Sequence, residues 1–253
     1  MPREARKTPV RWRLWLGLAL GALVSVSSAV GALKAIAYVA ADPRFTLPME
    51  PGDALTIQGV AYADRARIMA VFAPDFGRGA LTAPLAERRR RLLAIDWVAD
   101  ATVSRVWPNH LIVRIRERKP VAFAALPSGV ELIDSAGELL GIPPRTRFTF
   151  PVLDGLRADQ SPAQRRAAVA AFLRLQQEMG YLSKDISEVD VSDPGDLQIV
   201  ARVENHTVAL ILGDGDFASR YQNFVGHYDE IEKESPGAST FDLRLDDRIT
   251  ARK

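Results

Sequence analysis

Residues 97–123, which read WVADATVSRVWPNHLIVRIRERKPVAF, decide the fold of this chain. The stretch predicts a β-hairpin, because each arm alternates apolar and polar residues and a strand that buries one face needs that two-residue period. Pro108 and Asn109 supply turn chemistry between the arms. Pro120 has no amide hydrogen for a sheet ladder, so the hairpin is expected to end near it. The apolar positions are Trp97, Ala99, Ala101 and Val103 on the first arm and Leu111, Val113 and Ile115 on the second.

The composition excludes several classes of function. The chain has 253 residues, of which 47% are hydrophobic and 25% charged, so it can bury one large core or two small ones. A net charge of +2 gives no indication of a nucleic-acid-binding protein. The sequence contains no cysteine, which excludes disulfides, thiolate nucleophiles and cysteine-based zinc sites.

An uncharged stretch from Leu14 to Leu33 predicts a transmembrane helix over residues 14–38, because about 20 apolar residues cross the hydrocarbon core. Residues 1–13 carry an excess of arginine and lysine, whereas the segment after the helix is nearly neutral. The positive-inside rule therefore predicts a cytoplasmic tail over residues 1–13 and places the rest of the chain across the membrane. The alternative is a cleaved signal peptide, whose apolar core is normally shorter.

Between the membrane and the hairpin the sequence predicts one strand and two helices. Residues 42–53 contain three prolines and indicate a short extended linker. A strand is expected near residues 55–60, a first helix after Asp64 as N-cap, and a second helix after Pro84. With the hairpin, the order over residues 54–122 is β-α-α-β-β. Glu87 to Arg91 are expected on the solvated side of the second helix, where successive arginines lie about 100° apart and form no single patch.

Residues 123–253 predict a mainly antiparallel β domain with two flanking helices, so the fold class is α+β. The stretch Ser161-Pro162-Ala163-Gln164 is a capping box that begins the first of these helices. The second carries Phe217, Tyr221 and Phe224 at helical spacing. Strands are expected near residues 130–133, 138–140, 189–191, 197–203, 208–212, 240–245 and 248–251.

No pattern of catalytic or metal-binding residues stands out. The histidines His110, His206 and His227 lack the i, i+4 spacing of a helical metal site. Asp214-Gly215-Asp216 lacks the later ligands of a calcium loop and indicates a turn and helix cap. There is no glycine-rich phosphate loop and no nucleophile elbow. We therefore expect a protein that is not an enzyme and has no cofactor, no metal and no small-molecule substrate.

The hairpin resembles the FtsQ/DivIB family of bacterial cell-division proteins. The resemblance extends to Leu132-Ile133-Asp134 with Gly137, and to Phe241-Asp242-Leu243-Arg244 near the C-terminus. It implies that residues 54–122 form a POTRA domain and that the partners are the divisome proteins FtsB and FtsL. The matching hairpin residues are Trp97-Val98, Ala101, Val103, Arg105, Trp107-Pro108-Asn109, Leu111 and Glu117-Arg118-Lys119-Pro120-Val121-Ala122.

The last segment is the candidate binding site, because an edge strand offers unpaired backbone groups to another chain. The resemblance implies that Arg244, Leu245, Asp246, Arg248 and Ile249 lie near the FtsB contact. Two departures put the side-chain pairing in doubt: Leu245 stands where the family often has an aromatic residue, and Asp246-Asp247 replace a smaller turn. The alternative is that these residues only close the sheet.

The resulting hypothesis is a divisome assembly factor that links early and late division proteins. It would be a single-pass type II protein of the inner membrane, with periplasmic C-terminal domains at the division septum. One alternative is a POTRA-containing envelope transport or chaperone component, although such a protein normally carries a downstream β-barrel that the residues before Lys253 do not encode. A periplasmic enzyme of unrecognised type is the other alternative.

Overall fold

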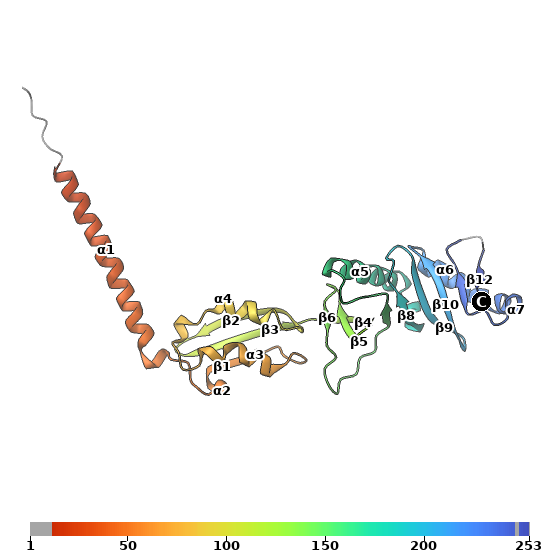
Figure 1. Cartoon of the computed structure of the whole chain (residues 1–253), viewed down its shortest axis with the longest axis horizontal. Coiled ribbons are helices and arrows are strands. Elements are labelled where there is room, and N and C mark those ends of the chain that lie inside the picture. Colours follow the sequence, from red (N-terminus) through yellow and green to blue (C-terminus); the bar gives the residue numbers. More distant parts are fainter. Residues whose placement is uncertain (1–11, 246–247, 253) are drawn as a thin grey trace, which may run out of the picture. The chain divides into compact units, whose positions relative to one another are not determined.

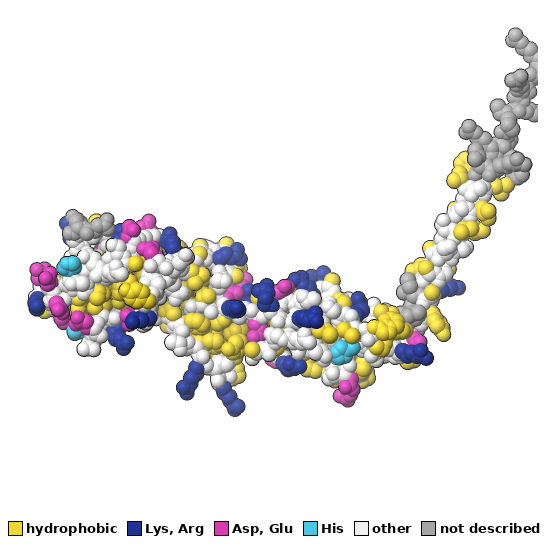
Figure 2. All heavy atoms as spheres, turned by 180° about the vertical axis from the view of Figure 1, so that it is seen from behind, with side chains coloured by type: hydrophobic (Ala, Val, Ile, Leu, Met, Phe, Trp, Pro, Cys, Tyr) yellow, Lys and Arg dark blue, Asp and Glu magenta, His cyan; other side chains and the backbone are white. Residues whose placement is uncertain are grey.

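The computed structural model describes residues 12–245 and 248–252 (Figure 1). Helix α1 (Trp12–Ala41) contains a 21-residue stretch, Trp15–Ala35, that is long and apolar enough to cross a membrane. None of that stretch is buried inside the protein, in contrast to the core helix of a soluble domain. Figure 2 shows hydrophobic side chains along this helix. The helix is longer at both ends than the predicted span of residues 14–38.

The chain forms two compact units, one built from residues up to Val60 with Asp64–Leu93 and Asp100–Ile115, the other from Ala61–Ala63, Ala94–Ala99 and Arg116 onward. In the first unit the strands pair in the order β1-β3-β2, with β1 parallel to β3. The predicted order β-α-α-β-β is confirmed, with two short additional helices before β1 and two between α3 and α4. The elements are η1 (Pro43–Phe45), α2 (Pro51–Ala54), β1 (Leu55–Gln58), α3 (Arg65–Phe72), η2 (Ala73–Asp75), η3 (Ala80–Thr82), α4 (Leu85–Leu92), β2 (Val98–Val106) and β3 (His110–Glu117).

Local signals explain most of this unit. Asp64 accepts hydrogen bonds from the backbone of Ala66 and Arg67 and so caps α3, as predicted. The second arm of the hairpin buries its three predicted apolar residues. The first arm alternates less cleanly, because Val98 is fully buried beside Trp97.

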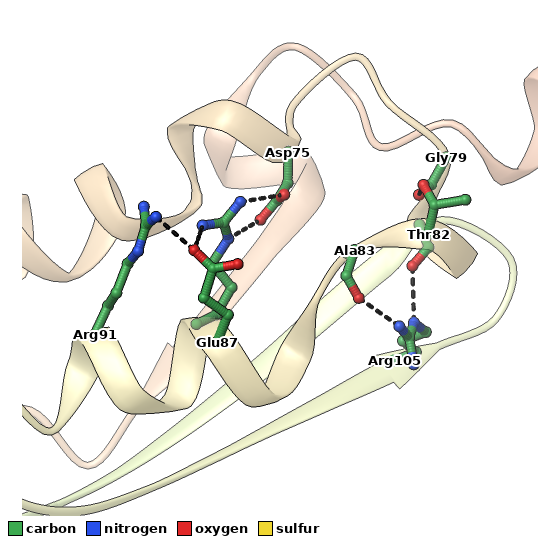
Figure 3. Close-up of polar contacts among 9 residues, drawn as sticks. Asp75, Gly79, Thr82, Ala83, Glu87, Arg91 and Arg105 are labelled. Atoms are coloured by element: carbon green, nitrogen blue, oxygen red, sulfur yellow. Dashed lines mark hydrogen bonds and ion pairs between the residues drawn. The ribbon is translucent and has the colours of Figure 1, made fainter.

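The predicted solvation of Glu87 to Arg91 is wrong for Arg88. Its side chain is buried and donates from Nε and Nη2 to the two carboxylate oxygens of Asp75, at 2.7 and 2.8 Å (Figure 3). The neighbouring arginines face elsewhere: Arg89 binds Asp100, and Arg91 binds Glu87 on the helix surface. The four arginines therefore form no common patch, as expected, but one of them belongs to the core.

Residues 42–53 are not simply extended. Phe45 and Leu47 are buried, and Thr46 forms an isolated antiparallel bridge with Gly79. The backbone of Leu47 also donates to Arg78 and accepts from Gly77. These bonds attach the segment that follows α1 to the first unit.

We predict a large loss of stability for Gly59→Ala. Gly59 has φ +78°, and a Cβ there would lie 2.1 Å from the carbonyl oxygen of Ile115, so β1 and β3 would have to separate. Gly237→Ala is the matched control, because Gly237 has the same φ but open space around it. Denaturant titration of the full chain should show a loss of about 1 kcal/mol for Gly237→Ala and several-fold more for Gly59→Ala. Equal losses would contradict the clash.

The second unit is built on a nine-stranded mixed sheet in the order β12-β11-β10-β9-β8-β7-β4-β5-β6. Three of its eight neighbouring pairs are parallel, namely β10–β11, β7–β8 and β4–β7, and the other five are antiparallel. The sheet is thus mainly antiparallel, as predicted. The strands are β4 (Pro120–Leu126), β5 (Gly129–Asp134), β6 (Leu139–Leu140), β7 (Val152–Asp154), β8 (Ile186–Asp190), β9 (Leu197–Val203), β10 (His206–Gly213), β11 (Thr240–Asp242) and β12 (Thr250–Arg252).

Helices pack on this sheet to form the main core. Helix α5 (Pro162–Met179) begins with the predicted capping box at Ser161 and is followed by the short η4 (Gly180–Asp185). The second predicted helix is interrupted at His227 and forms α6 (Phe217–Gly226) and α7 (Tyr228–Glu234). Figure 1 shows α5 and α6 beside the sheet, and their side chains Phe172 and Phe224 are fully buried in the core cluster.

Asp134 connects two of the stretches that carry the family resemblance, the one that contains Arg118 and the one that contains Asp134 itself. Its Oδ1 accepts hydrogen bonds from the backbone of Ala136 and Glu138, which closes the turn after β5. Its Oδ2 accepts from Arg118 at 2.9 Å. Both residues belong to the second unit, so the carboxylate links the segment just before β4 to the turn after β5.

Candidate partner-binding edge of the second unit

Strand β12 forms one outer edge of the nine-stranded sheet. It pairs antiparallel with β11, with Thr240 opposite Arg252 and Asp242 opposite Thr250, while β11 runs parallel to β10. The outer side of an edge strand presents backbone N–H and C=O groups that pair with no neighbour in the sheet. This edge can therefore accept a further strand by backbone hydrogen bonding.

Arg244 is held in place by two carboxylates. Its guanidinium donates to Asp242 at 2.9 and 2.7 Å and to Asp196 at 3.2 Å. The hydrogen bond from Arg244 lowers the pKa of Asp242, and the same bond is the main cause of a raised pKa for Arg244. Both groups are thus charged at neutral pH. Arg244 fixes the end of β11 rather than extending freely into solvent.

Leu245 and Ile249 are the two apolar residues of the predicted site. Leu245 is an exposed apolar residue with 49% of its surface accessible, and Ile249 is half-buried against the core cluster. Arg248 is exposed. Asp246, the remaining predicted site residue, lies outside the described residues, as does Asp247.

A cavity of about 370 Å³ adjoins these residues. Leu243, Leu245 and Ile249 supply its apolar wall. Polar residues of α6 and its N-cap line the rest of the cavity. They were not predicted as site residues, because the sequence of this helix indicates only a face of apolar residues that packs on the core. The helix-side residues are Asp216, Ser219, Arg220 and Asn223.

Asp196 is the other residue that the sequence analysis missed. It lies in the turn between β8 and β9, 48 residues before Arg244, and its local sequence Asp193-Pro194-Gly195-Asp196 indicates only a turn. Its role depends on a pairing across the sheet that no local pattern encodes.

The arrangement at this edge suits strand and side-chain docking. It combines an open sheet edge, an exposed leucine and a cavity whose wall is partly apolar. Among residues 12–245 and 248–252, no group of three or more histidine, aspartate or glutamate residues is arranged to hold a metal ion.

The comparison with protein families defines the class of protein. A family model described as a POTRA domain of FtsQ type matches residues 53–118, which contain β1, α3, α4, β2 and β3. The chain is thus an α+β protein with an apolar N-terminal helix, an FtsQ-type POTRA domain and a larger mixed sheet, and it fits a single-pass membrane protein.

Relatives that match nearly the whole of this chain give the particular family. The cell division protein FtsQ of Koribacter versatilis (strain Ellin345) is 34% identical over 254 residues, which cover 98% of this chain and 72% of the relative. The proteins of the same name from Shewanella oneidensis and Novosphingobium aromaticivorans are 26% and 28% identical, over 96% and 95% of this chain and 87% and 69% of theirs. The chain belongs to the FtsQ family of cell division proteins.

Proposed function

We propose that this chain is a non-enzymatic assembly factor of the division machinery and that β12 receives a strand from an FtsB-type partner, with an FtsL-type protein alongside. The observation that carries the proposal is the position of β12 at the edge of the sheet, next to the exposed Leu245 and the cavity at α6. Strand addition obtains affinity from main-chain hydrogen bonds and specificity from pockets for side chains. The edge strand β12 could supply the main-chain hydrogen bonds, and the cavity at α6 could supply the pocket.

We further propose a type II orientation in the inner membrane. The basic excess of residues 1–13 favours retention of the N-terminus in the cytoplasm. The two folded units then lie in the periplasm, where single-span partners present their own extracytoplasmic segments. The protein would link early and late division proteins at the septum.

Localisation tests the proposed role. A fluorescent protein fused to the N-terminus of the full chain should enrich as a band at mid-cell in dividing cells, because recruitment requires the partners at the septum. The matched control is the same fusion with Val130→Glu, which changes an exposed apolar residue of β5, far along the sheet order from β12. A uniform envelope signal from the unmodified fusion would contradict a divisome role.

A further inference from the structure

The tip of the β2–β3 hairpin carries an unusual exposed apolar surface. Trp107 is 69% exposed, and Val106 beside it is 40% exposed. Leu81 of η3 is exposed to a similar extent. Single exposed apolar residues are common, but an exposed tryptophan with apolar neighbours marks a contact surface. We call Leu81, Val106 and Trp107 the tip surface.

Contacts with neighbouring residues join the hairpin tip and η3 to the segment that leaves α1. The ring of Phe45 packs under Trp107, with ring centroids 4.4 Å apart. The bridge between Thr46 and Gly79 brings the same segment against the turn that precedes Leu81. Arg105 donates from Nε to the carbonyl oxygen of Ala80 at 2.8 Å and also binds Ala83, as Figure 3 shows for the latter. The tip surface is therefore a fixed feature of the folded unit.

The tip lies at the end of the unit where the chain enters from α1. Strand β1 is parallel to β3 with Leu55 opposite Leu111, so the start of β1 lies beside the start of β3, directly after the tip. His110 strengthens this placement, because its Nδ1 lies 2.8 Å from the carbonyl oxygen of Asp53 and its Nε2 lies 2.8 Å from Thr56 Oγ1.

Chain length keeps the tip near the bilayer. Phe45 lies four residue steps after Ala41, the last residue of α1, and four steps span at most about 14 Å. Ala41 itself lies about 9 Å along the helix from Ala35, where the apolar stretch ends. The headgroup region adds about 5–8 Å on each side of the hydrocarbon core. The tip surface is thus within reach of the headgroups.

We propose that the tip surface binds the lipid headgroup region of the leaflet from which α1 emerges, with Trp107 as the inserted residue. Tryptophan favours this region, because its ring is apolar and its indole N–H still needs a polar partner. The contact would hold the POTRA domain at the membrane surface through a second point besides α1. It does not depend on β12 or its partner, and only requires α1 to span the bilayer.

The absence of cysteine allows a direct test in the full chain. Val106→Cys places a fluorophore sensitive to its environment beside an intact Trp107, and Thr102→Cys is the control on the same strand, four residues away and also exposed. Both labelled proteins are reconstituted in phosphatidylcholine–phosphatidylglycerol vesicles with a spin label on the lipid headgroup. We expect quenching by these lipids to be at least about twofold stronger at position 106, with matching protection from aqueous iodide.

Adding Trp107→Ser to the Val106→Cys protein should reduce the lipid quenching to the level of the control. Co-flotation of each protein with the vesicles is measured in the same sample. Equal quenching at positions 106 and 102 with intact co-flotation would overturn the tip contact and leave the proposed division role untouched. Loss of co-flotation would overturn the membrane anchorage itself, and the tip contact with it. Protection of position 106 from iodide without lipid quenching would identify a protein contact, such as a second copy, and would also overturn the proposal.

Discussion

The substitution Asp75→Ala should destabilise the POTRA domain more than the substitution of any exposed residue in that domain. The change removes the bidentate partner of the Arg88 guanidinium, whose side chain is only 6% exposed, and leaves Glu87 at 3.7 Å as the remaining carboxylate. Removal of one partner of a buried pair costs about 3–5 kcal/mol, because the other charge stays buried without compensation. That is a large part of the about 5–15 kcal/mol that stabilises a typical domain.

Hydrogen exchange in the full chain measures this loss at the domain concerned. Amides of α4 and β3 should exchange about a hundredfold to a thousandfold faster in the Asp75→Ala protein. The control is Arg91→Ala, which breaks only the exposed pair with Glu87 on the same helix and should cost less than about 1 kcal/mol. The double variant Asp75→Leu with Arg88→Met should recover most of the protection, since apolar residues of similar size replace the whole pair. If the amides of the Asp75→Ala protein exchange no faster than those of the Arg91→Ala protein, the buried pair does not stabilise the domain.

The ion pair also has a defined pH behaviour. The hydrogen bond with Asp75 is the main cause of a raised pKa for Arg88. A group whose pKa is raised by folding contributes its stability below its ordinary pKa and loses it only as the pH rises through the folded value. Arg88 therefore remains charged throughout the neutral range, and the contribution of its guanidinium does not change with pH there.

Local patterns predicted the elements of this fold well. Strand β9 begins and ends at the predicted residues, and α5 begins at the predicted capping box, because alternation and caps are encoded within a few residues. The burial of Arg88 was not predictable in that way, since its partner Asp75 lies 13 residues earlier in a separate turn. A run of arginines predicts side chains exposed to solvent, because arginine is rarely buried without a paired carboxylate.

Long-range pairing accounts for the remaining differences. The parallel contacts of β7 with β4 and β8 join strands separated by other elements, and neither strand sequence specifies its neighbour. The same holds at the candidate site. Leu245 and an edge strand near the C-terminus were named as the candidate site, whereas the exposure of Leu245, the restraint of Arg244 by Asp196 and the wall supplied by α6 arise only in the folded sheet.

Glutamate substitutions at Leu245 and Arg248, close to β12, should strongly weaken binding of the proposed partner. Leu245→Glu places a charge at the exposed apolar wall of the cavity, and Arg248→Glu inverts the charge of an exposed side chain near it in the sequence. Buried apolar anchors at interfaces contribute about 2 kcal/mol or more each. The double variant of the full chain should therefore bind the periplasmic segment of an FtsB-type protein at least about a hundredfold more weakly in a detergent-solubilised binding assay.

Val130→Glu is the matched control for this experiment. Val130 is 55% exposed, close to the 49% of Leu245, and lies on β5 near the opposite edge of the same sheet. It should retain the partner within about threefold, since surface substitutions outside an interface usually change free energies by less than about 0.5 kcal/mol. If the unmodified chain, the double variant and the Val130→Glu protein all bind the partner equally well, the docking surface lies elsewhere on the molecule.

Proline substitutions separate backbone pairing from side-chain recognition at the same edge. Residues in an antiparallel strand direct their amides alternately toward one neighbour and the other. One of Thr250→Pro and Ala251→Pro therefore removes an amide that faces β11, and the other removes an amide that faces the open edge. The variant with unchanged thermal stability identifies the outward amide. If a partner strand adds to β12, that variant loses capture despite its intact fold, and normal capture by it would show that the partner uses side chains alone.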